Sequence, residues 1–455
     1  MAETLNSGPV STRLDRIAEL ARREPQRVFL SVSHVIDVEF LEEAYRRTRR
    51  DGAAGVDGQT ATGYAGALRA NLADLEKRFK TGTYWAPPVR RAYIPKGDGT
   101  KVRPIGIPTF EDKVLQRAVT MVLEAIYEQE FRDCSWGCRP GRSAHQALES
   151  LREGLMAMKG GWILEADIQG FFDHLDHSHL RSFLDSRVRD GNLRRAIDKW
   201  LKAGVMEEGS VWHPEEGTPQ GGVISPLLAN VYLHHVLDLW FEGDVVPRMK
   251  GKCFMVRYVD DFVLVFEREE DARKVYDVLP KRFGKYGLTL HPDKTRLIPF
   301  QRPKNPYERN RPQGPAPGTF DVLGFTHYWG RNLKGFWVVK RRTAEGRLTR
   351  AVKRIAEWCR RHRHEAVATQ HQRLSQKLKG HDAYYGITGN WEALKRFHDA
   401  AAESWRKWLN RRSQKADMWW PKFRLLLKNY PLPGPVVVHS VYRPQRSRGP
   451  RSRMR

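Results

Sequence analysis

Two carboxylate positions in the middle of the sequence could do chemistry. Asp167 follows the apolar run 163–166, and the pair Asp260-Asp261 stands between the apolar runs 254–259 and 262–266. Charged groups at the ends of buried strands are unfavourable unless something pairs with them, and adjacent carboxylates repel each other. Carboxylate oxygens are ligands that Mg²⁺ prefers, so divalent cations at these strand ends would relieve both penalties.

A pair of such ions about 3.5–4 Å apart could activate a hydroxyl nucleophile and steady a leaving pyrophosphate. The alternative is structural: Asp260-Asp261 forms an exposed turn, and Asp167 caps the following helix. For each position taken alone, the sequence supports the structural interpretation at least as well as the catalytic one. The choice therefore depends on what surrounds the carboxylates.

The elements that must position these carboxylates alternate between strands and helices. A hairpin is predicted over 91–108, because Gly97-Asp-Gly99 is a strong turn between two extended runs. Short strands are expected at 162–167 and 320–325 and near Arg296, and a loop over 301–318. Beyond Arg341 the pattern is helical to about Lys428. Further helices are predicted over 12–24, 38–50, 64–80, 111–130, 173–203, 223–240 and 271–286.

The composition is that of a folded protein of two or three domains. The chain has 455 residues, of which 40% are hydrophobic and 14 are Trp, which argues against disorder. Four cysteines are too few for a disulfide scaffold, so a reducing compartment is expected. No apolar run could span a membrane, and the N-terminus lacks the apolar core of a signal peptide. We expect a cytoplasmic protein without a membrane partner, associated with the nucleoid if bacterial.

The positive charge is concentrated at one end of the chain. The net charge is +26, and residues 331–455 hold 31 Lys and Arg against 8 Asp and Glu. Such an excess of positive charge normally serves to bind a polyanion, most commonly nucleic acid. Seven Trp are interleaved with these cations and suit base stacking, although the helical spacing of Trp405 and Trp408 favours core packing. The candidate nucleic-acid contacts in this region include Lys340, Arg341, Arg342, Arg406, Lys407, Arg411 and Arg412.

The motif Tyr258-Val-Asp-Asp261 resembles the catalytic hairpin of reverse transcriptases. With its flanking blocks it is similar to the group II intron-encoded reverse transcriptase/maturase family over roughly residues 40–440. The four-residue motif is weak by itself, whereas the ordered set of blocks is specific. These blocks are Gly55-Val-Asp-Gly58, Gly137-Cys-Arg-Pro-Gly-Arg142, Asp167-Ile-Gln-Gly-Phe-Phe-Asp173, Gly217-Thr-Pro-Gln-Gly-Gly-Val-Ile-Ser-Pro226, His291-Pro-Asp-Lys-Thr295, Phe320-Asp-Val-Leu-Gly-Phe325 and Pro431-Leu-Pro-Gly-Pro435.

The resemblance implies an α+β right-hand polymerase fold of fingers and palm, with an N-terminal helical extension and a C-terminal all-α basic thumb. The expected domains are the extension (1–60), fingers and palm (61–330), the helical thumb or maturase domain (331–428) and a basic tail, a remnant DNA-binding region (429–455). We expect no C-terminal endonuclease domain, which many relatives carry.

The implied function is RNA-directed DNA polymerase activity, adding dNTPs to a DNA or RNA primer on an RNA template. Two Mg²⁺ ions would serve as cofactors, with Mn²⁺ as an alternative. A structured group II intron RNA is the further expected partner, bound as a splicing maturase for retrohoming. The alternatives are a polymerase recruited to DNA repair or phage defence, and an RNA-binding maturase whose main role is splicing. The sequence is also compatible with a homodimer.

The resemblance assigns the site residue by residue. Asp167, Asp260 and Asp261 would be the catalytic metal ligands, with Asp261 adding charge or supporting the turn. Lys96 and Arg103 on the hairpin would grip the triphosphate, although a solvated hairpin face is the default for such side chains.

Four further residues would surround the nucleotide. The Phe172 ring would exclude a 2′-hydroxyl, or simply pack beside Phe171. Gln220 would contact the nucleotide or template, and Lys294 would protonate pyrophosphate or hold a structural position. Ile168 is also expected in the nucleotide-binding site. The sequence departs from the family at Val259, where Ala is usual.

Overall fold

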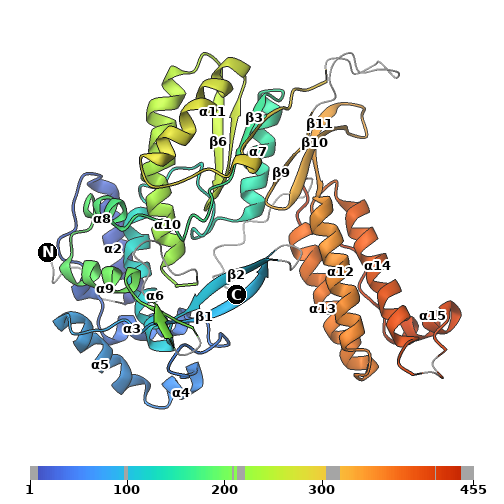
Figure 1. The fold of residues 1–455 in the computed structure, drawn as a ribbon, viewed down its shortest axis with the longest axis horizontal. Helices are drawn as coiled ribbons and strands as arrows, with labels where there is room; N and C mark the ends of the chain where they lie inside the picture. Colours follow the sequence, from blue (N-terminus) through green and yellow to red (C-terminus); the bar gives the residue numbers. More distant parts are fainter. Residues whose placement is uncertain are drawn as a thin grey trace. The chain divides into compact units, whose positions relative to one another are not determined.

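The computed structural model describes residues 9–96, 101–207, 210–212, 221–303, 318–413, 415 and 417–441 (Figure 1). The described residues form two compact units. The first contains 9–150 and 162–297, and the second contains 151–161 and 298–441. Strands and helices occur in both units, as the α+β prediction requires. The boundaries predicted for the four regions stay predictions.

The helices predicted before residue 290 are confirmed. Helix α6 illustrates why they form: Thr109 caps its first turn through the Asp112 N–H, and most of its side chains are buried. Helix α7 was not predicted from the sequence. Its first residues belong to the first unit, and its residues from 151 onward belong to the second. The helices are α2 (Val10–Arg23), α3 (Val38–Arg47), α4 (Ala61–Ala65), α5 (Leu68–Thr81), α6 (Phe110–Tyr127), α7 (Ala144–Ala157), α8 (His177–Asp185), α9 (Gly191–Leu201), α10 (Ser225–Leu233) and α11 (Glu269–Gly284).

A four-stranded sheet of order β6-β7-β3-β8 carries the predicted carboxylates. Its strands β6 (Cys253–Tyr258) and β7 (Asp261–Phe266) form an antiparallel hairpin, and β7 also pairs antiparallel with β3 (Trp162–Ala166). Strand β8 (Arg296–Pro299) lies at the edge beside β3. Helix α11 packs on β3 and β7 (Figure 1). The apolar side chains of β3 and β7 are thereby removed from water, which is the main driving force for this layer.

A second sheet contains the predicted hairpin. Strands β1 (Val89–Lys96) and β2 (Lys101–Ile107) pair antiparallel, with Ile94 opposite Arg103. The predicted turn at Gly97-Asp-Gly99 lies outside the described residues. Two short strands that the sequence did not predict extend this sheet: β4 (Val205–Glu207), parallel to β1, and β5 (Ser210–Trp212).

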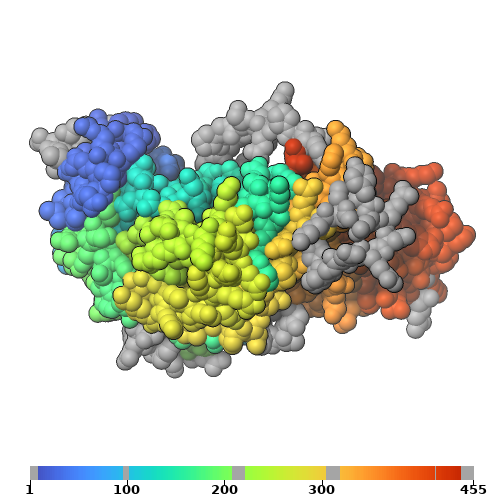
Figure 2. Space-filling view, turned by 90° about the horizontal axis from the view of Figure 1, so that it is seen from above, coloured from blue at the N-terminus to red at the C-terminus, as the bar shows by residue number. Residues whose placement is uncertain are grey.

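The N-terminal segment packs on the chain between α8 and α9 (blue and green in Figure 2). Phe29 and the residues at 187–189 exchange backbone hydrogen bonds of 2.7 and 2.9 Å. The buried guanidinium of Arg187 donates to the carbonyls of Pro25 (2.7 Å) and Arg27 (2.6 Å). This guanidinium therefore satisfies carbonyls just past α2 that have no partner in the helix. The N-terminal helices belong to the same core as the rest of the first unit.

The second unit joins a small sheet to a helical bundle. Trp405 is fully buried in the bundle core and donates from Nε1 to Gln370 (3.0 Å), so the core interpretation of this Trp is confirmed. The sheet has the order β11-β10-β9. Its strands and the helices that follow are β9 (Phe320–Val322), β10 (Phe325–Arg331), β11 (Trp337–Thr343), α12 (Glu345–Arg361), α13 (Val367–Tyr385), α14 (Trp391–Leu409) and α15 (Trp420–Asn429).

The expectation of an all-α region from residue 331 is wrong at its start, because β11 lies within it. The β-branched residues Val338 and Val339 favour a strand, and Val339 pairs with Trp329 across the hairpin. The Asn332 side chain accepts from the N–H groups of Lys334 and Phe336 and closes the turn. The helices begin only at Glu345. In the described parts of the chain, no helix is both long enough and apolar enough to cross a membrane.

Candidate active site at the ends of strands β3 and β6

The register of the sheet brings the predicted carboxylates to one edge. Tyr258 pairs with Asp261, so Val259 and Asp260 form a two-residue turn between β6 and β7. Ala166 pairs with Phe262, which places Asp167, the next residue along β3, beside the same turn. The structure therefore unites positions almost a hundred residues apart in the sequence.

A short segment after α11 holds the backbone at Asp167. The His291 N–H donates to the Asp167 carbonyl (2.8 Å), and the Gln169 N–H donates to the Thr289 carbonyl (2.8 Å). The 3₁₀ turn Pro292–Lys294 follows directly. It brings the Lys294 ammonium to 2.5 Å from Oδ2 of Asp167, in an ion pair that is partly exposed to solvent. The predicted block at 291–295 thus lies against the proposed catalytic strand end.

The electrostatics of the turn indicate two mutually repelling carboxylates. Burial raises the pKa of Asp260 above its ordinary value of 3.8, and the negative charge of Asp167 raises it further. The guanidinium groups of Arg103 and Arg257 act in the opposite direction. Asp261 is exposed at the start of β7. Arg103, on β2, is thus close enough to influence the carboxylate of the turn.

This donor set fits a divalent cation. Two carboxylates whose charges repel provide hard oxygen ligands, which Mg²⁺ takes together with water and substrate phosphates. Among the residues that the structure describes, no three His, Cys, Asp or Glu side chains form a ready metal cluster. The residues that would hold the ion are Asp167 and Asp260, and substrate oxygens would complete its coordination.

The two residues proposed to line the sugar pocket differ in burial. Phe172 is half-buried and meets the buried Phe171 edge-on, with ring centroids 5.3 Å apart. One part of the Phe172 side chain therefore stays open to a ligand. Ile168 is buried and forms an isolated bridge with Leu290, so only its backbone could contact a nucleotide.

Two of the other nucleotide-binding predictions concern Gln220 and Lys96. Gln220 lies outside the described residues, and so does the side chain of Lys96. Gly221, the residue after Gln220, has a φ of +116°, and a Cβ there would lie 2.6 Å from the Gly106 carbonyl oxygen of β2. Only glycine fits that close approach.

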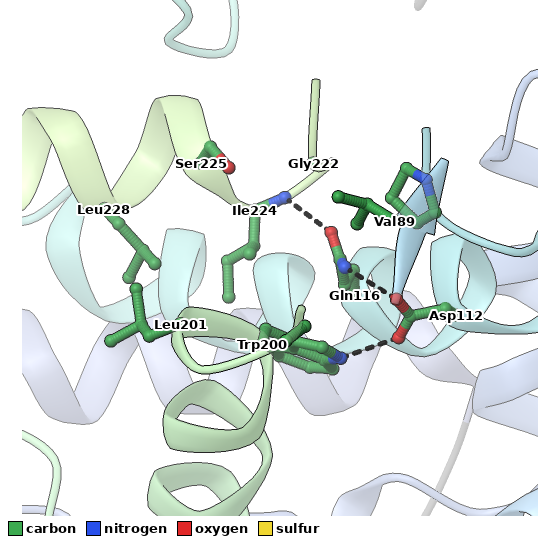
Figure 3. A pocket seen from close by; sticks show the side chains of 11 residues that line it. Val89, Asp112, Gln116, Trp200, Leu201, Gly222, Ile224, Ser225 and Leu228 are labelled. Carbon is green, nitrogen blue, oxygen red and sulfur yellow. Dashed lines mark hydrogen bonds between the residues drawn. The ribbon is translucent and has the colours of Figure 1, made fainter. Parts of the chain in front are cut away.

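A buried hydrogen-bond chain that sequence reasoning missed fixes the segment after Gly221 (Figure 3). Asp112 accepts from Trp200 Nε1 (2.6 Å) and from Gln116 Nε2 (3.1 Å). The Gln116 amide oxygen then accepts from the N–H group of Ile224 (3.4 Å), as Figure 3 shows, and from that of Val223 (2.8 Å). Burial raises the pKa of Asp112 to about 6. Two polar residues four apart on the apolar face of a helix were the signal available in the sequence.

A second missed feature lies under the Val259-Asp260 turn. Arg257, in the apolar strand β6, is fully buried and forms a bidentate ion pair with the equally buried Asp238. A charged residue inside an apolar strand was the available signal, because buried charges need partners.

The predicted nucleic-acid contacts of the second unit occupy different environments. Arg341 is buried, whereas Arg342 is exposed and lies over the Tyr328 ring. Lys407 and Arg411 are exposed and flank Trp408, their charged groups 6.0 and 5.5 Å from its ring centroid. The remaining three are partly buried: Arg406 lies over Trp420 and donates to the Met418 carbonyl, Arg412 donates to the Glu365 carbonyl, and Lys340 lies on β11.

Comparison with known proteins shows what the chain is similar to. Group II intron-encoded protein LtrA of Lactococcus lactis is 34% identical over 288 residues, which are 60% of this chain and 47% of that protein. Nuclear intron maturase 2, mitochondrial, of Arabidopsis thaliana is 29% identical over 225 residues, 39% of this chain and 30% of that protein. The chain thus spans about half the length of LtrA.

A third relative is matched over most of its length. Protein YkfC of Escherichia coli K12 is 32% identical over 328 residues, 63% of this chain and 84% of that protein. Residues 94–327 match the reverse transcriptase (RNA-dependent DNA polymerase) family and include both Asp167 and the β6–β7 turn. The chain therefore belongs to the reverse transcriptase family, in its group II intron-encoded reverse transcriptase/maturase branch.

Proposed function

We propose that this chain is an RNA-directed DNA polymerase that extends a primer with dNTPs on an RNA template. The observation that carries the proposal is the meeting of Asp167 and Asp260 at one sheet edge, where the negative charge of Asp167 raises the pKa of Asp260. In this proposal the β6-β7-β3-β8 sheet is the palm, the β1–β2 hairpin belongs to the fingers, and α12–α15 form the thumb.

Each of the proposed site residues has a separate role in nucleotide addition. When bound by Asp167 and Asp260, Mg²⁺, or Mn²⁺ in its place, would stabilise the negative charge that develops on the primer 3′-oxygen as it loses its proton, and the charge of the phosphates. Arg103 on the fingers hairpin orients the triphosphate by charge. The Phe172 ring blocks the position of a 2′-hydroxyl, and Lys294 supplies a proton from Nζ to the departing pyrophosphate.

Primer extension on an RNA template tests this function. Wild-type protein with dNTPs and Mg²⁺ is expected to extend the primer, whereas Asp167→Asn and Asp260→Asn are expected to fail. Asp277→Asn is the matched control, since Asp277 is exposed on α11. Extension by Asp260→Asn at the control's level would contradict the proposal.

We also propose binding of a group II intron RNA as a splicing maturase. The similarity to LtrA, an intron-encoded protein, and to the Arabidopsis intron maturase supports this activity, and recruitment to repair or defence is not favoured. The exposed cations beside Trp408 are suited to RNA phosphates. The Asp260→Asn protein should still promote splicing of such an RNA, because that carboxylate serves polymerisation. Loss of splicing with intact RNA binding would contradict a separate maturase role.

A further inference from the structure

The turn that carries Asp260 adopts a conformation that its own sequence disfavours. Val259 has a φ of +58°, which is rare for a β-branched residue because its branched side chain crowds the backbone. A two-residue hairpin turn with a positive φ at its first position normally has glycine there. The conformation at Val259 must therefore be held by groups outside the turn.

Arg257 is the residue best placed to hold it. One of its Nη1–H groups donates to the Val259 carbonyl (3.0 Å), and the other donates to Asn230 Oδ1 (2.9 Å). Nη2 donates to Ser135 Oγ (2.8 Å) and to Asp238 Oδ2 (2.6 Å), and Nε donates to Asp238 Oδ1 (2.7 Å). All five N–H donors of the guanidinium are thus used, and the side chain is fully buried.

The opposite side of the turn rests on Gly137. A Cβ at Gly137 would lie 2.5 Å from the Val259 nitrogen and 2.6 Å from its Cγ2, so the two backbones are in close contact. Asn230 connects the two supports, because its Nδ2 donates to the Gly137 carbonyl (2.8 Å) while its Oδ1 accepts from Arg257. Val259 is therefore held between Gly137 and Arg257, and Asn230 fixes the spacing.

We propose that Arg257, oriented by Asp238 and Asn230, is a positioning residue that fixes the Val259-Asp260 backbone and so aims the Asp260 carboxylate at the metal. The inference rests on the proposed function, because it assumes that Asp260 is a metal ligand. Arg257 contacts neither substrate nor metal in this account. Its hydrogen bond to the turn is the one that it donates to the carbonyl of Val259.

Lysine cannot replace arginine in this position. An ammonium is a compact charge without the planar fork that spans Asp238, Asn230 and Val259 at once. Arg257→Lys should keep the charge beside Asp238 but lose the turn contact. Asn230→Ala is the milder variant, because it leaves the Arg257–Asp238 ion pair intact and carries the test if Arg257→Lys does not fold.

The direct readout is Mn²⁺ binding, measured by electron paramagnetic resonance on the full chain with template and a 3′-deoxy primer. We expect Arg257→Lys and Asn230→Ala to weaken Mn²⁺ binding by about tenfold or more, as supporting residues of metal ligands do elsewhere. The maximal extension rate should fall as well, with the KM for dNTP changed less. Arg187→Lys is the matched control, because Arg187 is also a buried arginine, paired with Glu130, and its hydrogen bonds go to the carbonyls of Pro25 and Arg27 and not to the turn or its supports. It should lower the melting temperature without changing Mn²⁺ affinity.

A second-site change separates positioning from general stability. Glycine adopts a positive φ without strain, so Val259→Gly should restore most of the Mn²⁺ affinity lost in Arg257→Lys. Wild-type affinity in folded Arg257→Lys and Asn230→Ala, or failure of Val259→Gly to restore it, would overturn the inference while leaving the metal site intact. Undiminished Mn²⁺ binding by Asp260→Asn would overturn the metal site itself, and with it the proposed function.

Discussion

The ammonium of Lys294 lies 2.5 Å from the Asp167 carboxylate, although 127 residues separate the two in the sequence. The ion pair is possible because the His291 N–H binds the carbonyl of the same Asp167 and folds the following turn onto the strand end. An ammonium beside this proposed metal ligand would be in a position to give a proton to the departing pyrophosphate.

Replacing Lys294 tests whether it supplies a proton or only an ion pair. Lys294→Met and Lys294→Arg should both lower the maximal extension rate about 100-fold, since arginine retains the charge but does not release a proton. Rapid-quench measurement of single-nucleotide addition gives this rate, and Lys274→Met on α11 is the exposed control. A wild-type rate in Lys294→Arg would restrict Lys294 to the ion pair.

Phe172 should set the preference for deoxyribonucleotides. Phe172→Ala opens space beside the buried Phe171, so a 2′-hydroxyl would no longer be excluded. A pocket wall that excludes one small group typically separates two substrates by about 1–3 kcal/mol. Loss of the ring should therefore lower the dCTP/CTP ratio of kcat/KM roughly 10- to 100-fold. An unchanged ratio would assign Phe172 to the core alone.

Asp112 should make stability depend on pH in an unusual direction. Burial raises its pKa from 3.8 to about 6, so between these values the folded state binds more protons than the unfolded state. The contribution of Asp112 to stability is therefore largest below pH 3.8 and falls as pH rises to about 6, by roughly 3 kcal/mol.

Urea unfolding of wild type and Asp112→Asn from pH 4 to pH 8 measures this contribution. The difference in free energy of unfolding, wild type minus variant, should decrease up to about pH 6 and stay constant above it. A difference that is flat with pH, or that increases, would show that Asp112 is not held in this way.

The exposed cations beside Trp408 should contact phosphates. The Lys407→Ala/Arg411→Ala double variant is expected to weaken RNA binding and to reduce the slope of log affinity against log salt by about 1–2, because each lost phosphate contact removes a little under one unit. Fluorescence anisotropy across a salt series measures both. Lys395→Ala is the control, since Lys395 is already paired with Asp399 at 2.7 Å. An unchanged slope in the double variant would exclude these contacts.

The local pattern was enough to predict most elements before residue 290 and the strand ends that carry the proposed metal ligands. Apolar runs ended by Asp167 and Asp260 identify strand ends, and the family resemblance predicts that they meet. The hairpin β10–β11 was harder, because basic residues on β11 resemble the helical region that follows. Its strand identity comes from pairing with β10, a contact that is not local in sequence.

The supporting residues could not be predicted for a similar reason. Arg257 and Asp112 each look anomalous in an apolar segment, but their roles depend on partners elsewhere in the chain. Arg257 needs Asp238 and Asn230, while Asp112 acts on Ile224 only through Gln116. Buried polar networks are set by tertiary geometry, and a single sequence does not contain their pairings.

The most direct test of the account is a single-turnover rate for one dNTP addition to a primer annealed to RNA. Asp260→Asn should lose about 10³-fold or more in this rate while its dissociation constant for the template–primer stays within about twofold of wild type. The exposed Asp277→Asn should match wild type in both quantities. A rate for Asp260→Asn within about twofold of wild type would contradict the assignment of Asp167 and Asp260 as the polymerase site.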